Sequence, residues 1–232
     1  MSNPLLQRVK ANPHGRDFLV GDVHGQYDML VAELRRVEFR RSVDRLFLVG
    51  DVIDRGPNSY KCLMLGYAPW AFPVLGNHEL MMRAAIGEDA SERMYVHWLT
   101  EGGMWYLIED RKSEKPVLLD AISTWPYAIE LEVGDKRLGI VHAEPPALWS
   151  DLDSAQRSND QGVIDEICTK MTWSRTRISK KDASLVGGID AVVCGHTIVE
   201  SPVTLGNVHF IDTGASRSKG GKLTLVDARS FF

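Results

Sequence analysis

Five short apolar runs of this sequence each end in residues that could bind a metal ion. The stretches read "DFLVGDVHG", "LFLVGDVIDRG", "FPVLGNHE", "LGIVHAE" and "AVVCGHT". The donor residues that close them are Asp22, His24, Asp51, Asn77, His142 and His196. One Asp after a strand is commonly a turn residue, but five such endings need a common cause. Ligand sites of α/β proteins gather at the carboxyl ends of strands, so we interpret the six residues as one site.

The chemistry of these donors predicts a pair of metal ions. All six are carboxylate, amide-oxygen or imidazole ligands and none is a thiolate, which suits Mn, Fe or Zn better than a structural cysteine-type zinc site. Six ligands exceed what one catalytic ion needs, but they suit two ions that share a carboxylate. Asp51 is our candidate for that bridge. Two ions about 3.5–4 Å apart are a recurrent device in phosphate ester chemistry.

The elements that must position these residues alternate in the first third of the chain. Strands are expected at 17–22, 45–50 and 72–76, with helices at 26–39 and 58–67 between them. This βαβαβ order favours parallel pairing and a layered α/β fold. The glycines beside the ligands are expected where the chain turns sharply or where backbone must approach a ligand closely.

The remaining two thirds of the chain change from helices to strands. Residues 78–110 are predicted to be mostly helical with a break at Gly102-Gly103, and residues 150–188 to be helix plus loop. Strands are expected at 127–133, 137–142, 191–194, 207–212 and 222–227. The sequence "EVGDKR" between the first two is typical of a hairpin turn. The whole pattern predicts an α/β protein with two packed, mostly mixed β-sheets flanked by helices.

Length and composition are typical of one soluble globular domain. The 232 residues are expected to form one domain spanning 1–232. The net charge of −4 and a pI of about 6.0 give no basic footprint for nucleic acid or an anionic membrane. We expect no signal peptide and no membrane span. The three cysteines lack CxxC spacing, which favours reduced thiols in the cytoplasm. A monomer is the default expectation.

The motifs together resemble those of metallophosphoesterases of the phosphoprotein phosphatase type. The segments "GDVHG", "GDVIDRG" and "GNHE", a lone histidine after a strand, and "GHT" follow in order. The segments "HWLTEGGMW", "TWSRTRI" and "FIDTGA" extend the similarity to phage and bacterial members over nearly the whole chain. The resemblance implies a calcineurin-like metallophosphoesterase fold. It also implies hydrolysis of phosphoserine and phosphothreonine in proteins, with phosphotyrosine as a further substrate.

The resemblance also implies a role for each site residue. Asp22 and His24 would hold one ion, Asp51 both, and Asn77, His142 and His196 the other. A metal-bridging water would attack phosphorus directly, and Mn²⁺ is the expected ion, with Fe or Zn as alternatives. His78 would be the general acid, oriented by Asp54. Arg55 and Arg175 would bind the phosphate oxygens.

One departure and two alternative functions follow from the same motifs. The family pattern His-Ala-Asp reads "HAE" here, with Glu144 in the third position, which puts substrate contacts of that loop in question. The related symmetrical diadenosine tetraphosphatases typically carry "AR" where this chain has Asp54-Arg55, so Asp54 favours a protein phosphatase. A scaffold that has lost catalysis would be expected to lack ligands, whereas every expected position is filled.

Several other conspicuous residues are interpreted as structural. We expect His14, His97 and His209 to be structural or surface residues, and Met81 and Met82 to pack in the core. Trp98, Trp105 and Trp173 are expected in the core or at the rim of the substrate site. The segment "SKGGKLT" lacks the frame and the following helix of a nucleotide-binding P-loop.

Overall fold

The computed structural model describes residues 3–158 and 160–232, and its strands form two mixed sheets. The six-stranded sheet has the order β1-β5-β6-β7-β9-β8, and the four-stranded sheet has the order β10-β2-β3-β4. The first comprises β1 (Leu6–Val9), β5 (Ala128–Val133), β6 (Lys136–Val141), β7 (Ala191–Cys194), β8 (Val203–Leu205) and β9 (Val208–Phe210). The second comprises β2 (Asp17–Val20), β3 (Arg45–Leu48), β4 (Ala71–Pro73) and β10 (Leu225–Asp227). The predicted α/β class with two mixed sheets is confirmed.

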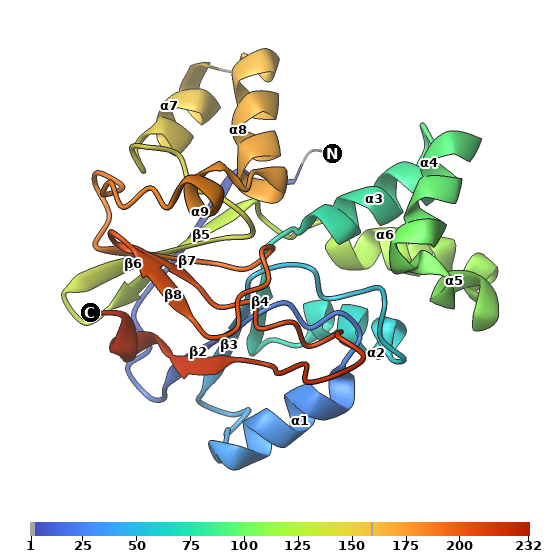
Figure 1. The fold of residues 1–232 in the computed structure, drawn as a ribbon, viewed down its shortest axis with the longest axis horizontal. Helices are drawn as coiled ribbons and strands as arrows, with labels where there is room; N and C mark the ends of the chain where they lie inside the picture. Colours follow the sequence, from blue (N-terminus) through green and yellow to red (C-terminus); the bar gives the residue numbers. More distant parts are fainter. Residues whose placement is uncertain (1–2, 159) are drawn as a thin grey trace.

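Helices cover the outer faces of both sheets (Figure 1). They are α1 (Tyr27–Arg36), α2 (Ser59–Leu63), α3 (Asn77–Ile86), α4 (Glu92–Trp98), α5 (Trp105–Ile108), α6 (Lys115–Ile122), α7 (Asp151–Ser158), α8 (Gln161–Trp173) and α9 (Thr176–Lys180). Short helical turns are η1 (Met64–Tyr67), η2 (Leu99–Gly103), η3 (Arg111–Glu114) and η4 (Ala228–Phe231). Helices α7 and α8 lie on the side of the six-stranded sheet, and α1 and α2 on the side of the four-stranded sheet, while α3 to α6 project to one side.

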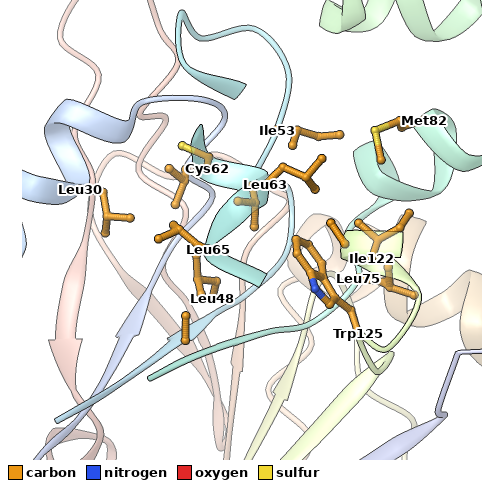
Figure 2. Packing of buried hydrophobic residues seen from close by; sticks show 14 of the residues in the cluster. Leu30, Leu48, Ile53, Cys62, Leu63, Leu65, Leu75, Met82, Ile122 and Trp125 are labelled. Carbon is orange, nitrogen blue, oxygen red and sulfur yellow. The ribbon is translucent and has the colours of Figure 1, made fainter. Parts of the chain in front are cut away.

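Three apolar cores separate these layers. The core between the sheets includes Leu19, Phe47 and Val49 from one sheet and Ile129, Leu138, Ile140 and Val193 from the other. A second core lies between the six-stranded sheet and α7 and α8. The third lies between the four-stranded sheet and α1, α2, α3 and α6, where residues such as Leu30, Leu48, Leu63 and Trp125 pack together (Figure 2). The architecture is therefore helix, sheet, sheet, helix.

Strand β3 shows why the strands that carry the motifs are continuously apolar. Leu46 and Leu48 face the outer core, whereas Phe47 and Val49 face the core between the sheets. Successive side chains of a strand point to opposite faces, so a strand buried on both faces needs apolar residues at every position. The pairings β2 with β3 and β3 with β4 are parallel, as the βαβαβ pattern predicted.

The observed helices and strands differ from the expected ones mainly in their end residues. A few short elements were not expected at all. The hairpin of β5 and β6 is confirmed, and Gly134 in its turn has φ 62°. The expected break in 78–110 is present, because Gly102 has φ 126° inside the turn η2. Strands β1 and β8 and helix α6 were not predicted. Strands of 3 to 4 residues at sheet edges and a short helix have too few residues to show a period.

No helix of the described residues combines the length and the apolar character needed to cross a bilayer.

Candidate metal centre

The six predicted ligands lie together where the two sheets meet. Strands β6 and β7 are parallel, as are β2, β3 and β4, so the carboxyl ends of each group share one edge of its sheet. The two edges are joined by hydrogen bonds: the ring Nδ1 of His142 lies 2.8 Å from the Val49 carbonyl, and the backbone N–H of His196 donates to Asp22 at 2.9 Å. All six side chains are buried. The structure thus brings the six predicted ligand residues to one region of the molecule.

One group of donor atoms surrounds the ring Nε2 of His142. This atom lies 2.9 Å from Asn77 Oδ1, 3.1 Å from His196 Nδ1 and 3.3 Å from an Asp51 carboxylate oxygen. His142 Nδ1 donates to the Val49 carbonyl, and His196 Nε2 lies 3.2 Å from the Trp173 carbonyl. The ring nitrogens that face each other therefore carry lone pairs. Four acceptors that converge in this way fit a cation between them.

Another group forms on the other side of the same carboxylate. His24 Nδ1 is 2.9 Å from the Ile53 carbonyl, which leaves Nε2 to face Asp51 at 3.6 Å. His78 Nε2 lies 4.0 Å from the same Asp51 oxygen. Ligand atoms of His24, Asp51 and His78 form one compact group, the first group, and those of Asp51, His142 and His196 form another, the second group. Asp51 belongs to both, which is the position that a bridging ligand requires.

The first group contains His78. The expected ligands of that ion were Asp22, His24 and the bridging Asp51. The Asp22 carboxylate instead accepts from the backbone N–H of His196 and lies outside both compact groups. Asp22 therefore borders the centre, and its predicted part in holding an ion remains a prediction.

The charge of the centre supports the assignment of cations. Asp22, Asp51, Glu79 and Asp212 are all at most 2 % exposed, and among the described residues none of them pairs with a lysine or arginine. Burial, followed by Asp212 and Asp51, raises the pKa of Asp22 well above its usual range. Although burial opposes it, the Asp51 carboxylate raises the pKa of His142. Buried carboxylates require a compensating positive charge, and divalent ions would provide it.

The backbone of the ligand loops is held in a conformation that side chains rarely adopt. His24, Asp51, Asp54, Arg55 and His196 all have positive φ, between 45° and 73°. Each such residue costs about 1–2 kcal/mol, so the surrounding structure must enforce it. Steric limits explain neighbouring glycines: a Cβ on Gly76 would collide with Asp51, and one on Gly195 with Asp22.

Glu79 enforces the Asp51 loop, and it was not among the residues predicted to form the site. Its carboxylate accepts from the backbone N–H groups of Asp51 at 3.0 Å, Val52 at 2.8 Å and Gly76 at 2.9 Å. Its bond to the Gly76 N–H satisfies a free backbone donor at the start of α3. A glutamate in the first turn of an expected helix is a helix-start signal, and it could have identified the residue.

The predicted general acid and its partner form a buried pair beside the first group. His78 Nδ1 lies 2.7 Å from Asp54 Oδ2, and the two side chains are 1 % and 0 % exposed. His78 Nε2 has no hydrogen-bond partner in the described structure. Burial disfavours the charged ring, but Asp51 and Asp54 outweigh it and raise the pKa of His78. With Nδ1 paired to Asp54, Nε2 is the ring atom that faces the centre without a partner.

The two predicted phosphate-binding arginines lie at opposite sides of the centre. Arg55 Nη1 donates to His24 Nε2 at 2.8 Å, and Arg175 Nη2 donates to the His196 carbonyl at 3.2 Å. One guanidinium therefore borders the first group and the other borders the second. An anion over the two groups would lie between them.

Glu144, the departure from the family pattern, supports the segment that carries Arg175. Its Oε2 accepts from the Ser174 hydroxyl at 2.7 Å and from the Arg177 backbone N–H at 3.0 Å. Lys170 lies 3.5 Å from the other oxygen. Glu144 thus makes contacts on both sides of Arg175 in the chain, and it leaves the metal ligands untouched.

The remaining residues singled out in the sequence mostly have structural places. Met81 and Met82 are buried in the core, and His14 and His97 are exposed, as expected. His209 is half-buried on β9 and packs against Phe231. The side chain of Trp173 is 44 % exposed, so it does not lie in the core.

Comparison with known proteins finds related phosphoesterases. The model of the calcineurin-like phosphoesterase family matches residues 18–200. Serine/threonine-protein phosphatase 1 of Salmonella typhimurium is 34 % identical over 224 residues, 96 % of each chain. The symmetrical bis(5'-nucleosyl)-tetraphosphatase of Klebsiella pneumoniae is 46 % identical over 143 residues, which are 60 % of this chain and 46 % of that protein.

A solved structure shows the same fold. The cold-active protein-tyrosine phosphatase of a Shewanella species superposes with a TM-score of 0.62 at 19 % identity, over 98 % of this chain and 78 % of that one. At this identity the likeness concerns the fold alone.

Proposed function

This chain belongs to the calcineurin-like phosphoesterase family, and from that premise we propose that it hydrolyses phosphoserine and phosphothreonine in proteins. The observation that carries the proposal is the buried His78–Asp54 pair, whose unpartnered Nε2 lies 4.0 Å from Asp51 in the metal centre. A phosphomonoester of serine or threonine has a poor leaving group, and protonation of the departing oxygen is the help it needs most. The 34 % identical phosphatase supports the same substrate class.

The proposed roles of the side chains follow from their places. Arg55 and Arg175 bind the phosphate oxygens from two sides and fix phosphorus above the two donor groups. His78 then gives the Nε2 proton to the leaving oxygen, while Asp54 accepts the hydrogen bond from Nδ1 and stabilises the charged ring. Phosphotyrosine would fit the same chemistry, because its better leaving group depends less on this proton.

Two divalent ions would be held by Asp22 and His24, by Asn77, His142 and His196, and by Asp51 between them. Bound ions would activate water as a nucleophile and stabilise the charge of an in-line displacement. We infer Mn²⁺ as the working ion from the family resemblance. Fe and Zn are alternatives, because oxygen and imidazole donors accept all three ions. Residues 1–232 would act as one domain. The buried, free cysteines support a cytoplasmic location.

A second candidate function is the symmetrical hydrolysis of dinucleoside tetraphosphates. The observation that favours it is the 46 % identity to the Klebsiella tetraphosphatase over 143 residues, higher than the identity to the phosphatase over the whole chain. Asp54 argues against it, because the related tetraphosphatases typically carry alanine there.

A comparative hydrolysis assay separates the two functions. The protein is stripped with chelator, reconstituted with Mn²⁺, and offered a phosphoserine peptide, p-nitrophenyl phosphate and diadenosine tetraphosphate. We expect no turnover after stripping and Mn²⁺-dependent phosphate release from the peptide. Cleavage of diadenosine tetraphosphate alone would assign the chain to the nucleotide hydrolases, and full activity in excess chelator would contradict the metal centre.

Substitution of Glu144 should weaken substrate binding more than turnover. Glu144→Ala removes two hydrogen bonds around Arg175, so we expect KM to rise about tenfold, equal to about 1.4 kcal/mol, with kcat nearly unchanged. Glu144→Asp restores the usual family residue, which has a shorter reach. Its KM should lie between those of the wild type and of Glu144→Ala. Steady-state kinetics on the phosphopeptide measure this, and a loss confined to kcat would contradict the role.

A further inference from the structure

Asp54 is held by a single short segment of the chain in addition to His78. The indole Nε1 of Trp105 donates to Asp54 Oδ1 at 2.7 Å, and the indole Nε1 of Trp98 donates to Oδ2 at 2.9 Å. Oδ2 is also the atom that lies 2.7 Å from His78 Nδ1. Both oxygens of the carboxylate are thereby fixed, and two of the three side chains that fix them come from residues 98–105, which we call the tryptophan segment.

The tryptophan segment also holds the neighbouring arginine. Between the two tryptophans, the carbonyl of Gly102 accepts from the backbone N–H of Arg55 at 3.1 Å. Gly102 has φ 126°, and a Cβ there would lie 2.8 Å from the Arg55 nitrogen. Only glycine allows this approach. The segment therefore contacts two consecutive residues, Asp54 and Arg55, whose own backbones have positive φ.

The indoles are suited to hold a carboxylate in one orientation. Trp98 and Trp105 are 0 % and 5 % exposed. Their rings meet edge to face at 6.1 Å, and Trp98 packs on Tyr106 at 5.5 Å, so neither ring can turn freely. An indole N–H donates but accepts no proton. Burial raises the pKa of Asp54, and the hydrogen bonds from His78 and the two indoles oppose that effect.

We propose that Trp98 and Trp105 are positioning residues that act through Asp54 to aim His78 at the leaving group. This inference rests on the proposed function, because it assigns the two indoles to the protonation step. With one indole removed, the Asp54 carboxylate loses one of the three hydrogen bonds that orient it, and it can rotate away from His78 Nδ1. The His78 ring then loses the contact that fixes its direction.

The test compares esters whose leaving groups need protonation to different degrees. Trp98→Phe and Trp105→Phe keep an aromatic ring and delete the N–H. We expect kcat to fall about tenfold for phenyl phosphate and less than about threefold for p-nitrophenyl phosphate, with KM and bound Mn²⁺ unchanged. Trp125→Phe is the matched control, because Trp125 is 2 % exposed and its Nε1 has no partner in the described structure. Its ratio of the two rates should equal that of the wild type.

Equal losses on the two esters, or no loss, would overturn the positioning role. If one variant does not fold, the other carries the same test, since each indole binds a different oxygen. The contact itself has a separate readout: the indole ¹H–¹⁵N resonances assigned to Trp98 and Trp105 should move in Asp54→Ala, and unmoved resonances would overturn the contact. A wild-type protein that hydrolyses neither ester with Mn²⁺ would refute the proposed function, whereas an active protein with an unchanged ratio would refute only this inference.

Discussion

The variant Asp51→Asn is expected to lose on the order of 10³-fold of the phosphatase rate, the upper end for loss of one group that stabilises transition-state charge. Asp51 is the one side chain common to both groups of donor atoms, 3.3 Å from His142 and 3.6 Å from His24. An asparagine has nearly the same shape, but it supplies one neutral acceptor oxygen where the carboxylate supplies two charged ones. The change should therefore weaken the binding of both ions together.

Metal content and rate must be measured on the same preparations. We expect fewer than two Mn²⁺ per chain by elemental analysis and little recovery of activity when Mn²⁺ is raised. Asp135→Asn, in the exposed turn of the β5–β6 hairpin, is the control for loss of one negative charge and should behave as the wild type. An Asp51→Asn protein with normal metal content and a near-normal rate would show that Asp51 is not the bridge.

The variant His78→Asn should lose far more activity on alkyl phosphates than on p-nitrophenyl phosphate. General acid catalysis contributes about 10²–10⁴-fold, and we expect a loss in this range for a phosphoserine peptide. Nitrophenolate leaves without protonation, so its loss should be under about tenfold. The reason is structural: Asp54 occupies Nδ1 at 2.7 Å, which leaves Nε2 as the donor.

The same variant decides between two roles of His78. Its ring contributes an atom to the first group of donor atoms, which is also the place of a ligand. Retained Mn²⁺ with a leaving-group-dependent loss supports the general acid. Loss of metal with equal losses on all esters supports the ligand. His97→Asn, on the exposed face of α4, is the matched control and should change neither quantity.

The six candidate ligands could be selected from the sequence because each follows a strand, and a strand end is a local property of the sequence. The apolar runs at β2, β3, β6 and β7 are buried on both faces, so hydrophobicity marks them clearly. A glycine and then a donor residue follow β2, β3 and β7, and His142 follows β6 directly. Asp212 obeys the same rule after β9, within "FIDTGA", and could have been found in this way.

The contacts that orient the ligands were not predictable, because they join residues far apart in the chain. Trp98 and Trp105 lie 44 and 51 residues from Asp54, and the side chain of Glu144 reaches 33 residues to Arg177. Nothing in the local spacing distinguishes an indole that packs in a core from one that also binds a carboxylate.

Candidate ion ligands and the strands that precede them can be recognised from local sequence. The meeting of the edges of two separate sheets, where the Val49 carbonyl lies 2.8 Å from the ring of His142, is a property of the folded chain. That meeting depends on the shared core between the sheets, in which residues from both interdigitate. Periodicity reports which face of a strand is buried, but the partner against which it is buried is set by packing of the whole chain.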